Sequence, residues 1–296
     1  MKKTLAMMTA AMMTVGALAG CGSSSSTPAA TTAAATEAAT EAATDAATTE
    51  AAGDTAAAAE GTVKTPSGKF TVGFDQEFPP MGFVGDDGQF TGFDLDLAKE
   101  VASRLGLEFV PQPINWDAKD MELDSGNIDC IWNGFTMQGR EDAYTWVGPY
   151  MANNQVFVVT ADSDIASKAD LAGKAVEVQK DSSGLAALQD DAELSASFGS
   201  MTEVADYNTA LMDLESGACD AVCMDSIVAG YQIKSSGKDM KILDDTLSAE
   251  EYGIGFKKGE DELAKAVYDT LMEMKDDGTV AKISNDWFGS DVFTLK

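Results

Sequence analysis

The hydrophobic positions of this chain form regular patterns only after residue 66. Lys69–Phe74 alternates polar and apolar residues, which is typical of a half-buried strand. Asp94–Leu105 repeats apolar residues at helical spacing, which predicts an amphipathic helix. Leu263–Lys275 has the same spacing and is expected to stop at Gly278.

Short apolar runs between these two helices predict buried strands. The runs are Ile128–Ile131, Val156–Thr160, Ala175–Gln179 and Ala221–Met224, and a further helix is expected to begin at Leu185–Leu188. Strands that alternate with helices along a chain indicate an α/β fold.

The first 20 residues have the composition of a signal peptide. Lys2 and Lys3 precede an apolar run to Gly20 that is too short to span a bilayer comfortably. The run ends Leu18-Ala19-Gly20-Cys21, which resembles a lipobox, the signal after which the cysteine is diacylated and becomes the mature N-terminus. The alternative is ordinary signal-peptide cleavage beside an incidental cysteine.

Residues 21–65 follow as a segment of very low complexity. After Cys21 it consists almost entirely of Ser, Thr, Ala, Glu and Asp, without an aromatic residue, Leu or Ile. Such a composition buries too little apolar surface to offset chain entropy, so we expect a disordered tether. As a flexible coil its ends would lie on the order of 35–40 Å apart.

Charge and residue usage exclude several function classes. The formal net charge of −29 disfavours nucleic acid as a partner. The absence of histidine excludes a Ser-His-Asp triad and the commonest zinc ligand. Cys219 and Cys223, in a predicted strand, would lie roughly 13 Å apart, too far for a disulfide. With Cys130 in a similar apolar setting, buried free thiols are favoured over a metal site.

Six short blocks follow one another between residues 66 and 296. They are Phe74–Met81, Gly92–Leu97, Asn133–Arg140, Leu171–Ser183, Ala221–Ser226 and Asp277–Gly289. In this order they resemble the family 3 extracellular solute-binding proteins, the polar amino-acid receptors of ABC importers. The resemblance implies a two-lobed α/β fold of the type II periplasmic-binding-protein kind, with the lobes joined by two crossing strands.

The resemblance also implies where the lobes begin and end. Lobe 1 takes residues 66–150 and 255–296, and lobe 2 takes residues 151–254. The crossings fall near Met151–Gln155 and Tyr252–Gly255. A ligand that contacts both lobes would stabilise their closed arrangement.

The family reading assigns the charged ends of an amino acid to two residues. Arg140 would bind the carboxylate with its guanidinium fork, and Asp225, at the end of an apolar strand, would pair with the ammonium. Arg140 could instead form a surface ion pair with Glu141 or Asp142. Arg140 follows Thr136 by four residues, one fewer than in many relatives.

Small polar residues complete this expected clamp. Thr136 offers a hydroxyl and Gly134 a carbonyl, and the missing Cβ of Gly134 would permit close approach. Ser182 and Ser183 precede a helix, so their N–H groups would point at an anion. They could equally be a plain N-cap.

The rest of the expected site would contact the ligand's side chain. Phe78 and Trp116 resemble the aromatic walls of the family, although core packing is the commoner use of such residues. Asp75, Asn133 and Gln179 are candidates for reading a polar side-chain end, and each could instead hydrogen-bond only to backbone.

We therefore expect a binding protein without a cofactor, a metal or enzyme activity. It would be a monomer, lipid-anchored at Cys21 on the outer face of the cell membrane, that presents its closed lobes to ABC permease subunits. Alternatives on the same fold are a periplasmic dehydratase and the sensor module of a membrane kinase or cell-wall enzyme; a purely structural lipoprotein is a third. The pairing of Arg140 with Asp225 favours binding, and the short stretch after Gly289 argues against an output domain. Asp75 favours a polar or cationic amino acid, and a glutamine-type ligand fits too.

Overall fold

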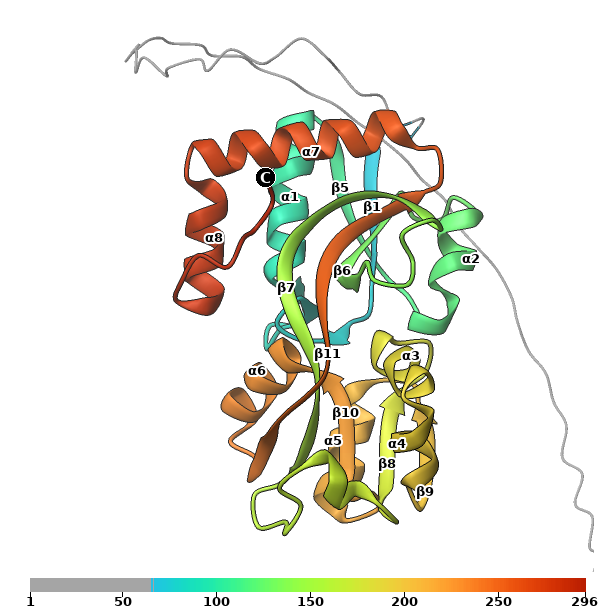
Figure 1. Ribbon diagram of the computed structural model, residues 1–296. Helices are drawn as coiled ribbons and strands as arrows, with labels where there is room; N and C mark the ends of the chain where they lie inside the picture. Colours follow the sequence, from blue (N-terminus) through green and yellow to red (C-terminus); the bar gives the residue numbers. More distant parts are fainter. Residues whose placement is uncertain (1–64, 66) are drawn as a thin grey trace, which may run out of the picture. The chain divides into compact units, whose positions relative to one another are not determined.

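The computed structural model describes residues 65 and 67–296 (Figure 1). Its strands are β1 (Lys69–Phe74), β2 (Glu77–Phe78), β3 (Gly82–Val84), β4 (Phe90–Thr91), β5 (Glu108–Pro113), β6 (Cys130–Thr136), β7 (Tyr144–Thr160), β8 (Ala175–Gln179), β9 (Ser200–Val204), β10 (Ala221–Asp225) and β11 (Met240–Lys257). Its helices are α1 (Phe93–Leu105), α2 (Lys119–Asp124), α3 (Ser183–Asp190), α4 (Ala192–Ser197), α5 (Tyr207–Ser216), α6 (Ser226–Ser236), α7 (Asp261–Asp276) and α8 (Thr279–Phe288), with short 3-10 turns η1 (Trp116–Ala118) and η2 (Lys168–Leu171). This mixture of strands and helices confirms the predicted α/β class.

The main sheet has the strand order β5-β1-β6-β11-β7-β10-β8-β9. At one end β1 lies parallel to β5 and β6, and at the other β8 lies parallel to β9 and β10. The two middle strands, β7 and β11, run antiparallel to each other. The sheet therefore consists of two parallel α/β layers joined by one antiparallel pair.

The strands β7 and β11 are long enough to take part in both layers. Their pairing runs from Lys257 opposite Tyr144 to Met240 opposite Thr160. Figure 1 shows both strands curving from the layer that carries β1, α1 and α7 into the layer that carries β8, β10 and α3. Residues 248–252 pair with residues 151–155 midway, which brings the middle of both strands between the layers.

Helices close the apolar faces of both layers. On α7 the residues Leu263, Val267, Leu271 and Met274 are buried, as their spacing predicts. In Figure 1, α7 lies across the end of lobe 1 that is remote from lobe 2, and α1 and α8 run from there along the side of lobe 1 toward lobe 2. The two cores are thus built from helices that belong to different parts of the chain.

Two strand predictions were wrong in their bounds. The run predicted at Ile128–Ile131 becomes a strand that begins at Cys130 and continues to Thr136. The polar Asn133 and the following glycine hid that continuation, because an apolar run was the signal used. Likewise β7 begins at Tyr144, far ahead of the predicted Val156, since its first half alternates polar and apolar residues.

The three described cysteines are free and buried, as expected. Burial raises the pKa of the Cys130 and Cys223 thiols. Cys219 precedes β10 instead of lying in a strand. The predicted signal peptide, Cys21 and the tether fall outside the described residues apart from Thr65. Within the described part of the chain no helix is long and apolar enough to cross a membrane, and no acidic or cysteine cluster could hold a metal ion.

The start of α1 connects distant parts of lobe 1. Asp94 is buried, and its Oδ2 accepts hydrogen bonds from the Gly134 N–H at 2.7 Å and the Tyr150 hydroxyl at 2.8 Å. Burial raises the pKa of Asp94 to about 7. Two residues on, Asp96 accepts a bond from the Trp287 indole of α8 at 2.8 Å. The helix start thus connects α8 with the part of β6 expected to bind ligand.

Gly92, which precedes α1, has a backbone that only glycine adopts readily. Its φ is +148° and its ψ is 162°. A Cβ at this position would lie 2.2 Å from the carbonyl oxygen of Met81. The close approach of these two backbones fixes where α1 begins.

We expect Gly92→Ala to lower the free energy of unfolding by about 3 kcal/mol or more, since it adds backbone strain and a clash with a carbonyl group. Gly230→Ala, inside α6 with open space around the new methyl group, should instead raise it by about 0.5–1 kcal/mol. Denaturant unfolding of both variants checks this. Equal stability of the two variants would contradict the role given to Gly92.

Candidate functional site

Three cavities lie where lobe 1 meets lobe 2, and two of them are lined by the predicted site residues. The larger, about 870 Å³, is lined by Asp75 and Trp116 of lobe 1 and by segments of lobe 2, and we call it the Asp75 cavity. The second, about 670 Å³, is lined by Arg140 of lobe 1 and Ser183 of lobe 2, and we call it the Arg140 cavity. Because Lys180 lines both cavities, they are neighbouring parts of one cleft.

Asp75 connects the two lobes across this cleft. Its Oδ1 accepts the Glu77 N–H at 2.8 Å, and its Oδ2 accepts the Gln179 side-chain amide at 2.7 Å from the other lobe. The Asn133 Oδ1 accepts the Asp75 N–H at 3.0 Å. Burial raises the pKa of Asp75 to about 6. The structure therefore brings together the three residues that sequence reasoning grouped as side-chain readers.

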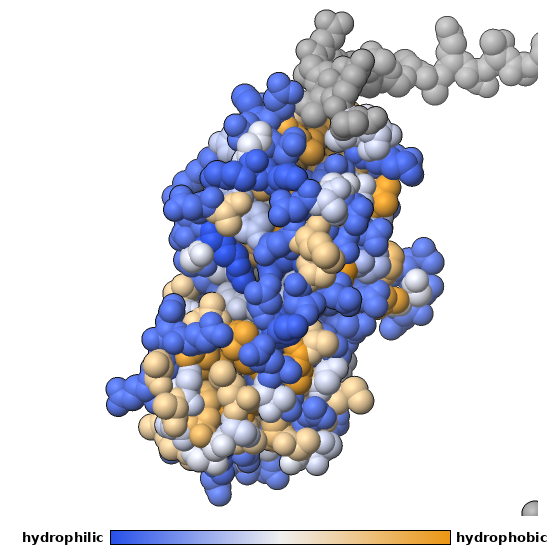
Figure 2. All heavy atoms as spheres, turned by 90° about the vertical axis from the view of Figure 1, so that its right-hand side faces the viewer, coloured by the Kyte–Doolittle hydropathy of each residue, from blue (hydrophilic) through white to orange (hydrophobic). Residues whose placement is uncertain are grey.

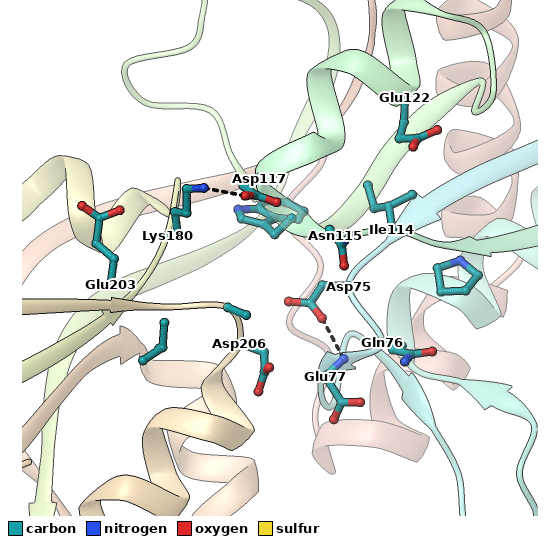
Figure 3. Close-up of a pocket in the computed structure, with 14 residues that line it drawn as sticks. Asp75, Gln76, Glu77, Ile114, Asn115, Asp117, Glu122, Lys180, Glu203 and Asp206 are labelled. Atoms are coloured by element: carbon teal, nitrogen blue, oxygen red, sulfur yellow. Dashed lines mark hydrogen bonds and ion pairs between the residues drawn. The ribbon is translucent and has the colours of Figure 1, made fainter. Parts of the chain in front are cut away.

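Acidic side chains dominate the Asp75 cavity. Figure 3 shows carboxylates from both lobes around it, with Lys180 bound to Asp117. That ion pair measures 2.7 Å and both of its members are largely exposed. The acidic lining residues are Asp75, Glu77, Asp117, Glu122, Glu203 and Asp206. An acidic wall of this kind favours a cation over an anion.

Arg140 is positioned by backbone carbonyls instead of by carboxylates. Its Nη1 donates to the Thr136 carbonyl at 3.2 Å, and its Nη2 donates across the cleft to the Asp181 carbonyl at 3.2 Å. The guanidinium carbon lies 5.1 Å from the centre of the Phe135 ring. Among the described residues it forms no ion pair with Glu141 or Asp142. The guanidinium therefore has no anionic partner of its own in the cleft.

The small polar residues of the expected clamp have separate roles. The Ser182 hydroxyl accepts the Leu185 N–H at 3.1 Å, so Ser182 is the N-cap of α3. The Ser183 hydroxyl instead receives a bond from Thr136 of lobe 1 at 3.2 Å and one from the Gln155 amide at 3.1 Å. Thr136 and Ser183 thus meet directly between the lobes.

Gly134 lies in a crowded part of β6 where a side chain would not fit. Its φ is +57°, and a Cβ would lie 2.9 Å from the Phe78 ring and 3.1 Å from the Tyr252 ring. Phe78 in turn packs against Tyr207 of lobe 2, with ring centres 5.7 Å apart. Trp116 contacts the Phe135 ring edge-on at 5.5 Å while also lining the Asp75 cavity. The two aromatic residues are buried, and Trp116 is the one that faces open space.

Asp225 ends β10 as a buried carboxylate with three donors. Its Oδ1 accepts the Tyr252 hydroxyl and the Asn153 amide, each at 2.7 Å, and its Oδ2 accepts the Tyr207 hydroxyl at 2.9 Å. Burial, and then the nearby Glu250 carboxylate, raise the pKa of Asp225 to about 7. No cation contacts it within the described part of the chain. Its charge is therefore hydrogen-bonded but not neutralised.

Sequence reasoning missed four polar residues of the cleft. Glu250, Asn153 and Gln155 come from the middle of β11 and β7, and all three are buried. Glu250 belongs to an acidic pair that looks exposed, and the two amides precede the apolar run that was read as the strand. Lys119 was not singled out, because a lysine is usually exposed, yet its side chain is 2% exposed. A longer strand assignment for β7 would have revealed Asn153 and Gln155.

Lys119 closes one edge of the cleft through an ion pair with Asp181 of lobe 2. Asp181 adopts a φ of +58°, unusual for a residue other than glycine. Its neighbour Lys180 forms a second ion pair, with Asp117 of η1. Two ion pairs therefore join the segment around η1 and α2 in lobe 1 to residues 180–181 of lobe 2. The Lys119 pair is half buried and the Lys180 pair is exposed, so the first should contribute more to holding the lobes together.

Comparisons with known proteins show which family this chain resembles. The sequence profile of the bacterial extracellular solute-binding proteins, family 3, matches residues 70–290. The L-cystine-binding protein TcyJ of Escherichia coli (strain K12) is 32% identical over 231 residues, which cover 76% of this chain and 84% of TcyJ. The L-cystine-binding protein TcyA of Bacillus subtilis (strain 168) is 32% identical over 229 residues, covering 76% of this chain and 83% of TcyA.

Solved structures show the same similarity. An ABC uptake transporter substrate-binding protein from Streptococcus pneumoniae with bound histidine has a TM-score of 0.75 and 34% identity, and the match covers 77% of this chain and 96% of that one. An ancestral arginine-binding protein bound to arginine has a TM-score of 0.70 and 36% identity, covering 75% and 99%. The two-lobed architecture of this chain is therefore that of the type II binding proteins.

We expect Lys119→Met to reduce the closed fraction about tenfold relative to the open one, because the buried half of the ion pair is lost while Asp181 returns to water. Lys180→Met, which removes the exposed pair between the same two segments, should change that ratio less than about twofold. Small-angle X-ray scattering would report opening as a larger radius of gyration. If Lys180→Met increased the radius of gyration more than Lys119→Met, the Lys119 ion pair would not be the one that contributes more to holding the lobes together.

Proposed function

The chain belongs to the bacterial extracellular solute-binding proteins of family 3, and we propose that it captures one free, polar amino acid between its lobes for an ABC importer. The observation that carries this function is the charge arrangement of the cleft. Among the residues that the structure describes, the Arg140 guanidinium has no anionic partner in the cleft. The Asp225 carboxylate, buried behind the cleft wall, has no cationic partner among them either. A zwitterion supplies both missing charges.

The contacts of the main-chain part of the ligand follow from that arrangement. Arg140 would turn its fork from the Asp181 carbonyl to the ligand carboxylate, since a charged acceptor forms the stronger bond. Thr136 and Ser183, now bonded to each other, would each gain the ligand as a partner. Asp225 and its neighbours would receive the ammonium. Contacts from both lobes to one molecule would favour the closed arrangement.

The side chain of the ligand would enter the Asp75 cavity. Buried Asp75, linked to Gln179 of the other lobe, and the acidic residues around it support a polar or cationic side chain. Among the similar proteins are receptors described as binding cystine, histidine and arginine. We propose a ligand of this group, with Trp116 as the wall beside its side chain.

An enzyme on the same fold remains the second candidate function. The relatives compared above are binding proteins, and the clamp of Arg140 with buried carboxylates supports holding an amino acid rather than converting it. A bound amino acid recovered unchanged after prolonged incubation would separate binding from catalysis. Recovery of a dehydrated or deaminated product would establish the enzyme instead.

Attachment to the outer face of the membrane is a further part of the proposal. It rests on Leu18-Ala19-Gly20-Cys21 and on the low-complexity segment between Cys21 and the folded region. Two acyl chains at Cys21 would anchor the protein stably where one would not. The tether would then let the lobes reach permease subunits.

A thermal-shift screen against the twenty amino acids with ornithine, citrulline and cystine tests the function. A cognate ligand at a hundredfold excess over Kd adds about 2.7 kcal/mol, which should raise Tm by roughly 5–10 °C. Arg140→Lys keeps the charge but loses the fork, and we expect it to weaken binding by about 2–5 kcal/mol.

Arg104→Lys is the matched control, because Arg104 pairs with Glu100 and Asp277 away from the cleft. Calorimetry should give this variant the wild-type Kd. No stabilisation by any amino acid would refute the proposed function, whereas wild-type affinity in Arg140→Lys would move the carboxylate site elsewhere.

Cys21→Ser should release the protein from the membrane fraction, because the residue that carries the acyl chains is gone. Ser23→Ala, two residues on, should leave the protein membrane-bound. Fractionation and mass spectrometry of the N-terminus provide the measurement. Tight membrane association that persists in Cys21→Ser would exclude the anchor.

A further inference from the structure

Glu250 occupies the point where the crossing strands meet the cleft. It lies on β11 directly opposite Asn153 of β7, and its side chain is buried. It also lines the Arg140 cavity together with Thr136 and Ser183. Asp225 is absent from that lining, so of the two buried carboxylates Glu250 is the one that borders open space.

One amide group bridges the two carboxylates. The Asn153 Nδ2 donates to the Glu250 Oε1 at 2.7 Å and to the Asp225 Oδ1 at 2.7 Å. The Glu250 Oε1 also accepts the Gln155 amide at 2.9 Å and the Ser183 hydroxyl at 3.4 Å. Glu250 and Asp225 are therefore neighbours held through a shared donor.

This pair of buried acids has no counter-ion among the residues that the structure describes. Neither carboxylate forms an ion pair with a Lys or Arg, and all of the groups that bond to them are neutral amides and hydroxyls. The Gln155 Oε1, on a fully buried side chain beside them, also has no hydrogen-bond partner. Adjacent buried anions are unfavourable unless a cation joins them. The cluster thus provides acceptors for a cation that the protein itself does not supply.

We propose that Glu250 is a second acceptor for the ammonium group of the bound amino acid, acting beside Asp225 and tying that group to the crossing strands. This proposal rests on the proposed function, because it assigns a contact within the same cleft. A site with two carboxylates discriminates more strongly against a ligand without an ammonium group than a site with one carboxylate. It therefore selects amino acids over the 2-hydroxy acids that have the same side chain. Glu250 is then a specificity residue on a strand shared by both lobes.

The test compares Glu250→Gln with Glu251→Gln, which changes the adjacent, exposed residue of β11. The ligand used is whichever of L-cystine, L-arginine and L-histidine stabilises the wild type most. It is compared with the 2-hydroxy acid that has the same side chain but carries a hydroxyl group in place of the α-ammonium group. We expect Glu250→Gln to weaken amino-acid binding about 10- to 100-fold and 2-hydroxy-acid binding less than about threefold. Glu251→Gln should change both by less than about twofold.

A second measurement uses the ligand-free protein. Glutamine keeps the acceptor for Asn153 and Gln155 but removes one of two adjacent buried charges. We therefore expect Glu250→Gln to raise Tm by about 2–4 °C at pH 8 without ligand. A residue that served only the fold would change Tm in the opposite direction, and Glu250→Asp, which keeps the charge, should retain part of the amino-acid affinity.

The outcomes separate this inference from the proposed function. If the wild type binds no amino acid, both are overturned. If the wild type binds but Glu250→Gln and Glu251→Gln have the same affinity, only the role of Glu250 is overturned. If Glu250→Gln lost the same factor of affinity for the amino acid and for its 2-hydroxy acid, the role of Glu250 would likewise be overturned. The carboxylate would then not be contacting the ammonium group.

Discussion

The antiparallel pairing of β7 with β11 is the interaction on which the rest of the structure depends. These strands pair from one layer of the sheet into the other, so each lobe is built on a different half of the same ladder. Where the ladder passes between the lobes, its side chains are Asn153, Gln155 and Glu250. Backbone hydrogen bonds thus fix the centre of the cleft, while the walls on either side belong to different lobes. A polar cluster at this point can contact residues of both lobes.

Several charged groups of the cleft lower the stability of the folded protein, because they are buried or lack a charged partner among the described residues. Asp225 and Glu250 are buried without a cation, and Asp75 is buried against Gln179 with a raised pKa. Arg140 is left bonded to carbonyl groups. Each group would be better satisfied in water or by a charged partner, so the folded chain keeps unfavourable terms that a zwitterion bound as proposed would remove. This is the physical sense in which such a cleft is complementary to its ligand.

Much of this could be read from the sequence, and the exceptions have physical causes. The alternating pattern predicted β1 and the apolar run predicted β8 to the residue, because the apolar side chains of both strands are buried or half-buried. The second half of β6 and the first two thirds of β7 were missed, since polar residues such as Asn133, Asn153 and Gln155 interrupt the apolar runs. The grouping of Asp75 with Gln179 was predicted by resemblance. Lys119 and Glu250 could not be found, because their burial arises from contact with a distant segment that composition does not reveal.

The nesting of one lobe inside the other has a consequence for the order in which the protein is made. The helices and strands between β7 and β11 come from one continuous stretch. In lobe 1, by contrast, β6 pairs with β11, which is synthesised much later. Phe93 of α1 likewise packs against Phe288 of α8, with ring centres 5.1 Å apart. A chain that emerges N-terminus first therefore holds the opening segment of lobe 1 with its apolar face uncovered while lobe 2 assembles. The segment that is synthesised first therefore cannot complete its native contacts until the final helix has been made.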